Sequence, residues 1–156
     1  MSASQEGFHN IAIKRIKPLI DKELYQQEKI LRLEVLLLPT GRTEWWHRDS
    51  ISEHIVALND QQLVVGCVLL VLGDEERQKN TAILCQMAVS EPYRSHGIGK
   101  RLVAECESTA LEQGVARIYL HARLTATKFY ENCGYKRQGE VFEEVGLPHV
   151  AMVKTL

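Results

Sequence analysis

The sequence lacks a long apolar run, an apolar leader and a concentration of charge of one sign. Its longest apolar stretch, residues 63–72, is about half as long as a helix that crosses a bilayer. Residues 1–10 are polar, without the apolar segment of a secretory signal. The formal net charge is -1 and the two signs are interspersed, so neither nucleic acid nor a membrane is an expected partner. These absences predict a soluble, cytoplasmic protein.

The cysteines lack the spacing of a metal site or a redox pair. All four stand far apart in apolar or helical settings, and no CxxC joins any two of them: Cys67, Cys85, Cys106 and Cys133. We expect buried, reduced thiols and no metal centre. With 156 residues, of which 45% are hydrophobic, the chain fills one core and is too short for two. We therefore expect a single domain over residues 1–156.

The first part of the chain predicts a strand and a helix. Residues 11–16 alternate apolar and basic side chains, as in a strand with one buried face. Apolar residues then recur at mostly three- and four-residue steps from Leu19 to Leu38. One long amphipathic helix is expected there, either continuous or interrupted, with Pro18 in its first turn.

A β-hairpin is predicted next. Residues 51–58 and 63–72 are rich in β-forming side chains, and the turn-forming residues 59–62 join them. Gly66 is expected to mark a bulge. Residues 73–80 then read as a charged loop.

The second half alternates strands and helices. Residues 81–89 are apolar apart from Gln86, as in a strand buried on both faces. A helical stripe begins at Ile98 and stops at Gly114, which suits the left-handed position after a helix. Further elements are expected as a strand at 115–122, a helix at 125–133, and strands at 135–142 and 149–156 around a loop at 143–148. In the first of these strands Tyr119 and His121 share one face. The order predicts a mixed α/β fold.

The turn between strand 81–89 and the following helix carries the first chemical signal. It contains two glycines at a helix N-terminus, in the run Tyr93-Arg94-Ser95-His96-Gly97-Ile98-Gly99-Lys100. A helix N-terminus offers unpaired amides and the positive end of the helix dipole, so the turn is a candidate pyrophosphate cradle. The P-loop pattern is absent, and Leu102 stands where a dinucleotide fingerprint has its third glycine.

These residues resemble the GNAT (GCN5-related) N-acetyltransferase family. The family motif [RQ]-x-x-G-x-[GA] corresponds to Arg94-Ser95-His96-Gly97-Ile98-Gly99. A second family signature resembles Phe129-Tyr130-Glu131-Asn132-Cys133-Gly134-Tyr135, and the run Glu143 to His149 resembles the ElaA-like branch. The resemblance implies the GNAT acyl-CoA N-acyltransferase fold, a central mixed and mostly antiparallel sheet flanked by helices. It also implies acetyl-CoA as cofactor and a small amine as partner.

The resemblance further implies roles for single residues. Backbone groups of Met87, Ala88 and Val89 would bind the pantetheine arm, and amides from Arg94 to Lys100 would bind the pyrophosphate. Tyr130 would act as general acid, because its phenol can give a proton to the departing thiolate. Arg123 stands where many members carry an Asn, so it is expected to reach a phosphate or a substrate carboxylate instead. Lys128 is also expected to contact the cofactor.

The base and the acceptor remain open at the level of sequence. The candidates for the base are Glu53, His54, Glu144 and His149, with Gln86 as a group that positions water. The segment 44–48 walls an acceptor pocket or covers the sheet as an apolar latch. The sequence is compatible with three functions: acetylation of a small amine, acetylation of a protein N-terminus or lysine, and CoA binding without catalysis. The resemblance also allows a homodimer.

Overall fold

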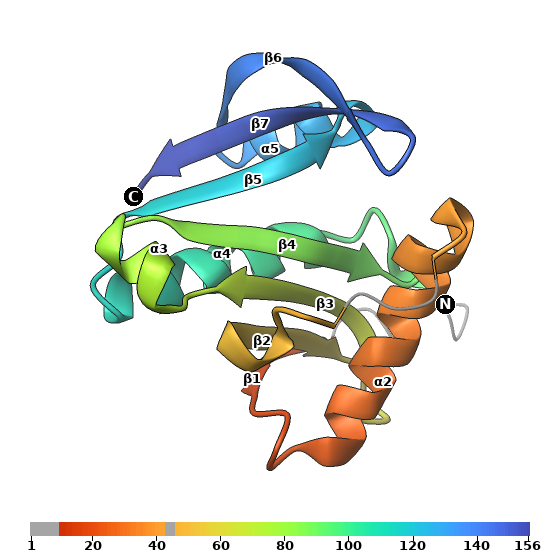
Figure 1. Cartoon of the computed structure of the whole chain (residues 1–156). Helices are drawn as coiled ribbons and strands as arrows, with labels where there is room; N and C mark the ends of the chain where they lie inside the picture. Colours follow the sequence, from red (N-terminus) through yellow and green to blue (C-terminus); the bar gives the residue numbers. More distant parts are fainter. Residues whose placement is uncertain (1–9, 43–45) are drawn as a thin grey trace.

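The computed structural model describes residues 10–42 and 46–156, which form one seven-stranded sheet (Figure 1). The spatial order of the strands is β1-β2-β3-β4-β5-β7-β6. Every neighbouring pair is antiparallel except β4 and β5. The strands are β1 (Ala12–Ile16), β2 (Ser52–Leu58), β3 (Val64–Val71), β4 (Ala82–Val89), β5 (Arg117–Arg123), β6 (Lys136–Glu144) and β7 (Leu147–Thr155). The predicted mixed, mostly antiparallel sheet is confirmed.

Helices cover the two faces of the sheet unequally. Helix α4 (Ile98–Glu112) packs on one face, where its apolar stripe joins the main core. Helix α2 (Lys22–Arg32) packs on the other face against β3 and β4. Helix α5 (Thr127–Asn132) follows β5, and Figure 1 places it on the same side as α4. The side of β5, β7 and β6 that faces away from α4 therefore stays largely uncovered in Figure 1.

Strands β4 and β5 separate soon after they begin. Their parallel pairing is confined to Ala82 with Ile118 and Ile83 with Tyr119. On the other side of β4, pairing to β3 shifts register between Leu69–Cys85 and Cys67–Ala88. One residue of β3 thus faces two of β4, and Gln86 takes a φ of 54°. Such a bulge bends a strand, which accounts for the divergence of β4 from β5.

The close approach of α4 to the sheet depends on Gly66. A Cβ at this position would lie 3.2 Å from Ile98 Cγ2 and 3.3 Å from Leu102 Cδ1. Gly66 also adjoins the register shift between β2 and β3 at Ala57 and Leu58. Its position therefore seats the first turns of α4 directly on β3.

Two details predicted for the first half of the chain are wrong. Helix α2 starts at Lys22 rather than at Pro18, because Lys17 to Asp21 form a turn in which the Asp21 carboxylate accepts a bond from the Lys17 amide. Leu19 and Ile20 are accordingly 87% and 73% exposed. Helix α3 (Asp74–Gln78) lies within the predicted charged loop.

The predicted loop at 143–148 is much shorter in the structure. Val145 and Gly146 alone separate β6 from β7, and both have positive φ angles, as in a tight hairpin turn. Of the two forms expected for the long helix, the structure has the interrupted one, since a π-helical turn (Leu33–Leu37) and a 3-10 turn (Leu38–Thr40) follow α2. Among the described residues, no helix is both long and apolar enough to span a membrane.

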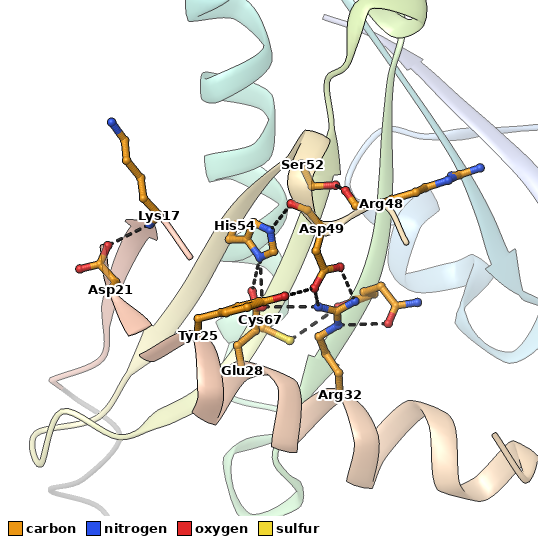
Figure 2. Close-up of polar contacts among 11 residues, drawn as sticks. Lys17, Asp21, Tyr25, Glu28, Arg32, Arg48, Asp49, Ser52, His54 and Cys67 are labelled. Atoms are coloured by element: carbon orange, nitrogen blue, oxygen red, sulfur yellow. Dashed lines mark hydrogen bonds and ion pairs between the residues drawn. The ribbon is translucent and has the colours of Figure 1, made fainter. Parts of the chain in front are cut away.

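A buried polar network joins α2 to the start of β2 (Figure 2). Arg32 makes a two-pronged contact with Asp49, at 2.9 and 3.0 Å, and its Nε donates to Gln86 at 3.2 Å. The Tyr25 hydroxyl donates to the same Asp49 carboxylate at 2.5 Å. Glu28 and Arg32 are both fully buried. Through Gln86 the network reaches the bulge that bends β4.

His54 completes this network as a charged ring. Its Nδ1 lies 3.0 Å from both Glu28 carboxylate oxygens, and its Nε2 lies 2.8 Å from the Asp49 carbonyl oxygen. Both partners only accept hydrogen bonds, so both ring nitrogens donate. Burial opposes this charge, but the hydrogen bond and negative charge of Glu28 outweigh it and raise the pKa of His54 above 6.5.

We expect Glu28→Ala to lower the free energy of unfolding by about 3–5 kcal/mol, because it leaves the buried His54 cation without its carboxylate and removes one of the two carboxylates that contact Arg32. The matched control is Glu34→Ala, at an exposed position just after the same helix. This change should stay within about 0.5 kcal/mol of the parent. Urea denaturation measures both, and equal values for the two variants would contradict the network's importance.

The state of His54 predicts a pH dependence of stability. A group whose pKa is raised by folding stabilises the fold fully below its unfolded pKa, and this contribution is lost as the pH rises through the folded pKa. The free energy of unfolding should therefore fall as the pH rises above about 6.5. NMR titration of the assigned His54 ring should give a midpoint above that of the urea-unfolded chain. A midpoint at or below the unfolded value would show that the ring is neutral in the fold.

Candidate functional site

A cavity of about 560 Å³ opens beside the C-terminal end of β4. Strand β4, the turn after it, the start of α4 and helix α5 contribute its walls. The lining residues are Met87, Val89, Tyr93, Arg94, Ser95, Gly97, Ile98, Gly99, Lys100, Phe129, Asn132 and Cys133. Eight of the predicted cofactor-binding residues are thus gathered in one wall: Met87, Val89, Arg94, Ser95, Gly97, Ile98, Gly99 and Lys100.

The N-terminus of α4 opens onto this cavity without a side-chain cap. Gly97 stands at the N-cap position with a φ of 80° and provides no side-chain cap for the first amides of the helix. The first helical bond from within α4 is made by the Arg101 amide. The amides before it are therefore available to an anion, which the helix dipole also attracts.

Two basic side chains flank these amides. Arg94 Nε donates to the Val89 carbonyl oxygen at 2.9 Å, which holds the guanidinium beside the end of β4. Lys100 lines the cavity from the first turn of α4. The turn thus has the positive charge and the free donors that a pyrophosphate requires.

The separated edge of β4 provides the rest of the site. Beyond Ile83 this edge has no strand partner toward β5 within the part of the chain that the structure describes. An extended ligand with amide groups can pair with such an edge as an added strand does. The Ala88 side chain points to the opposite face, where it packs in the cluster under α2. His96 is exposed on the turn and is absent from the described lining residues.

Tyr130 lies behind the cavity wall. It is 7% exposed and packs edge-on against Phe129 and Tyr135. Burial, then the nearby cysteines of which Cys106 is foremost, raise the pKa of Tyr130 well above 10. The hydroxyl therefore stays protonated, as a donor must. Among the described residues that line the cavity, helix α5 contributes Phe129 and Asn132, and Tyr130 is not one of them.

The candidate bases are spread over three places. Glu53 accepts a hydrogen bond from Gln113, just past the C-terminal end of α4, so a helix of about 20 Å separates it from the turn at Gly97. His54 belongs to the buried network with Glu28. Glu144 and His149 come together at the β6–β7 hairpin, with His149 Nε2 3.7 Å from the Glu144 carboxylate.

The remaining predicted residues take separate positions. The Gln86 amide oxygen accepts from Arg32 at the bulge. Arg123 ends β5 opposite His149, and Lys128 is exposed on α5. Neither lines the cavity within the described chain. Trp46 lies over the Arg32 guanidinium at 4.7 Å, whereas Glu44 and Trp45 of the same predicted loop lie outside the described residues.

The four cysteines are free, and burial raises the pKa of each thiol. Between residues 10–42 and 46–156, no group of three or more His, Cys, Asp or Glu side chains is placed to hold a metal ion.

Sequence reasoning missed two polar groupings. One is the buried network around Arg32. In the sequence, Glu28 and Arg32 look like ordinary surface charges on an amphipathic helix. The other joins Tyr119 and His121 of β5 to Glu144 of β6, with contacts of 3.0 Å. The alternation along β5 already indicated that Tyr119 and His121 share a face. Their partner on β6 depends on a strand pairing that sequence alone does not reveal.

Comparison with known proteins agrees with this geometry. The model of the acetyltransferase (GNAT) family matches residues 18–135. An uncharacterized protein, YyaT of Bacillus subtilis, is 32% identical over 111 residues, which cover 69% of this chain and 71% of that protein. Two crystal structures superpose closely. A putative N-acetyltransferase from Lactobacillus plantarum has a TM-score of 0.78 at 25% identity, and Escherichia coli ElaA has 0.77 at 22%; each alignment covers 93% of this chain and 99% of the other.

The uncapped helix start, the parted strands and the family match lead to one conclusion. The chain belongs to the GNAT family of acetyltransferases and is an acetyl-CoA-dependent N-acetyltransferase.

Proposed function

We propose that this enzyme transfers the acetyl group to the primary amine of a small molecule, by direct attack while both substrates are bound. The observation that carries this proposal is the separation of β4 from β5 beside the uncapped start of α4. It creates a site for acetyl-CoA at one side of the sheet and leaves the other side open to an acceptor. Acetyl-CoA supplies the thioester that the amine attacks.

Each part of the cofactor site has a proposed partner. Backbone groups of Met87, Ala88 and Val89 hold the pantetheine arm along the free edge of β4. Amides from Arg94 to Lys100 hold the pyrophosphate, with His96 contributing through its backbone. Arg123 and Lys128 stay proposed contacts for peripheral phosphates. Uncovered donors at the β4 edge also polarise the thioester carbonyl.

Tyr130 is the proposed general acid. Its hydroxyl gives a proton to the departing sulfur, and its raised pKa keeps it protonated until then. Its position behind Phe129 requires the sulfur to reach between α5 and β4. Of the predicted bases, Glu144 and His149 lie on the open face and suit the acceptor side. Glu53 and His54 are held in contacts away from it.

A second cavity supports a small acceptor. It measures about 560 Å³ and lies over β4, β5, β7 and β6, with α3 at one end. Ile83 and Tyr119, the last residues before β4 and β5 part, are both in its wall. Acidic and basic side chains line it together, including Glu76, Arg48 and Arg117. Such a cavity suits a polar amine that also carries an anionic group.

Two other functions compete with this proposal. Acetylation of a protein N-terminus or lysine is favoured by the uncovered face of β5, β7 and β6, which could receive a chain. CoA binding without catalysis is favoured by the burial of Tyr130. A thiol-release assay with acetyl-CoA against small amines and peptides separates all three, since only the last gives CoA binding without release. We further propose that the enzyme is a single cytoplasmic domain able to form a homodimer.

Gly97→Ala should weaken CoA binding about tenfold or more, because alanine is strained at a φ of 80° and its methyl group would stand in the turn proposed to hold the pyrophosphate. Gly114→Ala is the matched control. Gly114 follows the other end of α4, has a φ of 78° against 80° at Gly97, and at neither position would a Cβ meet an atom within 4 Å. The two changes should cost similar stability, and only the first should raise the calorimetric Kd. Equal Kd values would remove the turn from the cofactor site.

Tyr130→Phe should lower kcat about 100-fold and leave the Kd for CoA within about twofold, since it removes a proton donor and keeps the ring. Tyr135→Phe controls for the loss of a buried hydroxyl, because Tyr135 packs against Tyr130 and its hydroxyl bonds Glu107 at 3.3 Å. This variant should retain kcat. A similar kcat in both variants would exclude Tyr130 as the acid.

A further inference from the structure

We propose that Tyr119, His121 and Glu144 form a proton relay that takes the proton from the acceptor ammonium. The inference rests on the proposed function and adds the base that it requires. A primary amine with a pKa near 10 is mostly protonated at neutral pH and cannot attack until it loses a proton. The acceptor side of the site must therefore contain a group that receives it.

The relay lies on the face of the sheet that α4 leaves open. Along β5, Ile118, Leu120 and Ala122 are buried in the core with α4. Tyr119 and His121 alternate with them and so project to the opposite face. Figure 1 shows that α2 lies over the other half of the sheet. The His121 and Glu144 side chains accordingly remain 38% and 40% exposed.

The hydrogen bonds fix the direction of proton flow. His121 Nδ1 lies 3.0 Å from Glu144 Oε1, and His121 Nε2 lies 3.0 Å from the Tyr119 hydroxyl. A carboxylate only accepts, so Nδ1 carries the hydrogen in the neutral ring. The lone pair of Nε2 then accepts from the Tyr119 hydroxyl. A carboxylate that orients an imidazole toward a hydroxyl is the arrangement of an activated base.

Neighbouring side chains hold the imidazole in place. The Phe142 ring meets it edge-on at 4.9 Å between centroids, and Phe142 stacks on His149 at 6.1 Å. His149 Nε2 lies 3.7 Å from the second Glu144 oxygen. Among the described residues, His121 thus contacts Tyr119 and Glu144, and His149 lies beside Glu144 and Phe142. Arg123 follows on β5 two residues later, on the same face as His121.

The relay stands where the two substrates would meet. Tyr119 belongs to the last residue pair of β4 and β5, and His121 follows where the strands have parted. The cofactor cavity lies beside α4 and α5, whereas the relay is on the other face. An amine that approaches from the open face therefore reaches the gap from the side opposite CoA. Glu144 and His149 were proposed as separate bases. Here Glu144 is hydrogen-bonded through His121 to the Tyr119 hydroxyl, and His149 lies beside Glu144.

Tyr119 connects the relay to the acceptor cavity, because it also lines the second cavity. The same wall contains Glu76, which is only 8% exposed. Glu75 lines the cavity beside it. Carboxylates in the wall attract a cation, so this wall suits the ammonium form of the acceptor. The proton then has a short route from the ammonium to the Tyr119 hydroxyl.

The proton balance closes with groups already named. The ammonium gives one proton to the Tyr119 oxygen as the Tyr119 hydroxyl proton passes to His121 Nε2, which yields a free amine and an imidazolium beside Glu144. The amine nitrogen then bonds the acetyl carbon, the carbon–sulfur bond breaks, and the sulfur takes a proton from Tyr130. The nitrogen loses its second proton, which restores Tyr130. The exposed imidazolium releases the first proton to water.

The relay is tested by measuring kcat/KM against pH, between about pH 6 and 10, for the parent and for His121→Gln and Tyr119→Phe. In each variant kcat/KM should be about 100-fold lower than in the parent at pH 7. Their kcat/KM should then climb roughly tenfold per pH unit, because only amine deprotonated by the solvent can react. The parent should lack this climb, because the relay takes the proton from the ammonium.

Glu144→Gln should lower kcat/KM about tenfold or more, since the amide no longer fixes the imidazole tautomer. Glu143→Gln, at the exposed neighbouring position on β6, is the matched control and should behave as the parent. Unchanged CoA affinity and melting temperature show that each variant is folded. If the parent turns over and both His121→Gln and Tyr119→Phe keep its rate within twofold and its pH profile, the relay is wrong. If the parent binds CoA and acetylates no amine, the proposed function fails and the relay fails with it.

Discussion

The bulge at Gln86 is the constraint on which the functional architecture depends. A regular β4 would continue its parallel pairing with β5 and would close the gap that we propose for the cofactor. Instead, two residues of β4 face one of β3, and pairing with β5 ends after Ile83. A non-glycine residue with positive φ is strained and persists only where its surroundings hold it. Here the Gln86 amide accepts from the buried Arg32, so helix α2 helps to fix the bend.

The bend divides the sheet into two working sides. Toward α4 lie the uncapped helix start and the cavity beside β4, which match an anionic, extended ligand. Away from α4 lie the open face of β5, β7 and β6 and a second cavity with side chains of both charges. Because the strands part between these sides, a bound thioester and an incoming amine can meet without either crossing the sheet. This layout supports the direct transfer that we propose.

Histidines of this protein illustrate how environment decides function. His54 and His121 both contact a glutamate through Nδ1 at 3.0 Å. The Nε2 of His54 donates to a backbone carbonyl oxygen, so the ring is held as a cation in a buried network. Loss of its proton would leave a buried hydrogen bond unmade. The Nε2 of His121 faces a hydroxyl on an open surface, which leaves it free to accept one. The first ring serves the fold and the second suits the chemistry.

Local signals in the sequence determined much of this protein. The glycines at 97 and 99, the alternation along the strands and the helical stripe after Ile98 act over a few residues, and they predicted the family, the sheet and the turn at the start of α4. Long-range pairing decided the rest. The burial of Glu28, Arg32 and Asp49, the bulge at Gln86 and the meeting of His121 with Glu144 depend on segments distant in the chain. Their side chains look like ordinary surface charges until the fold removes water from them or places them in register, because charge pairing and strand register are properties of neighbours in space.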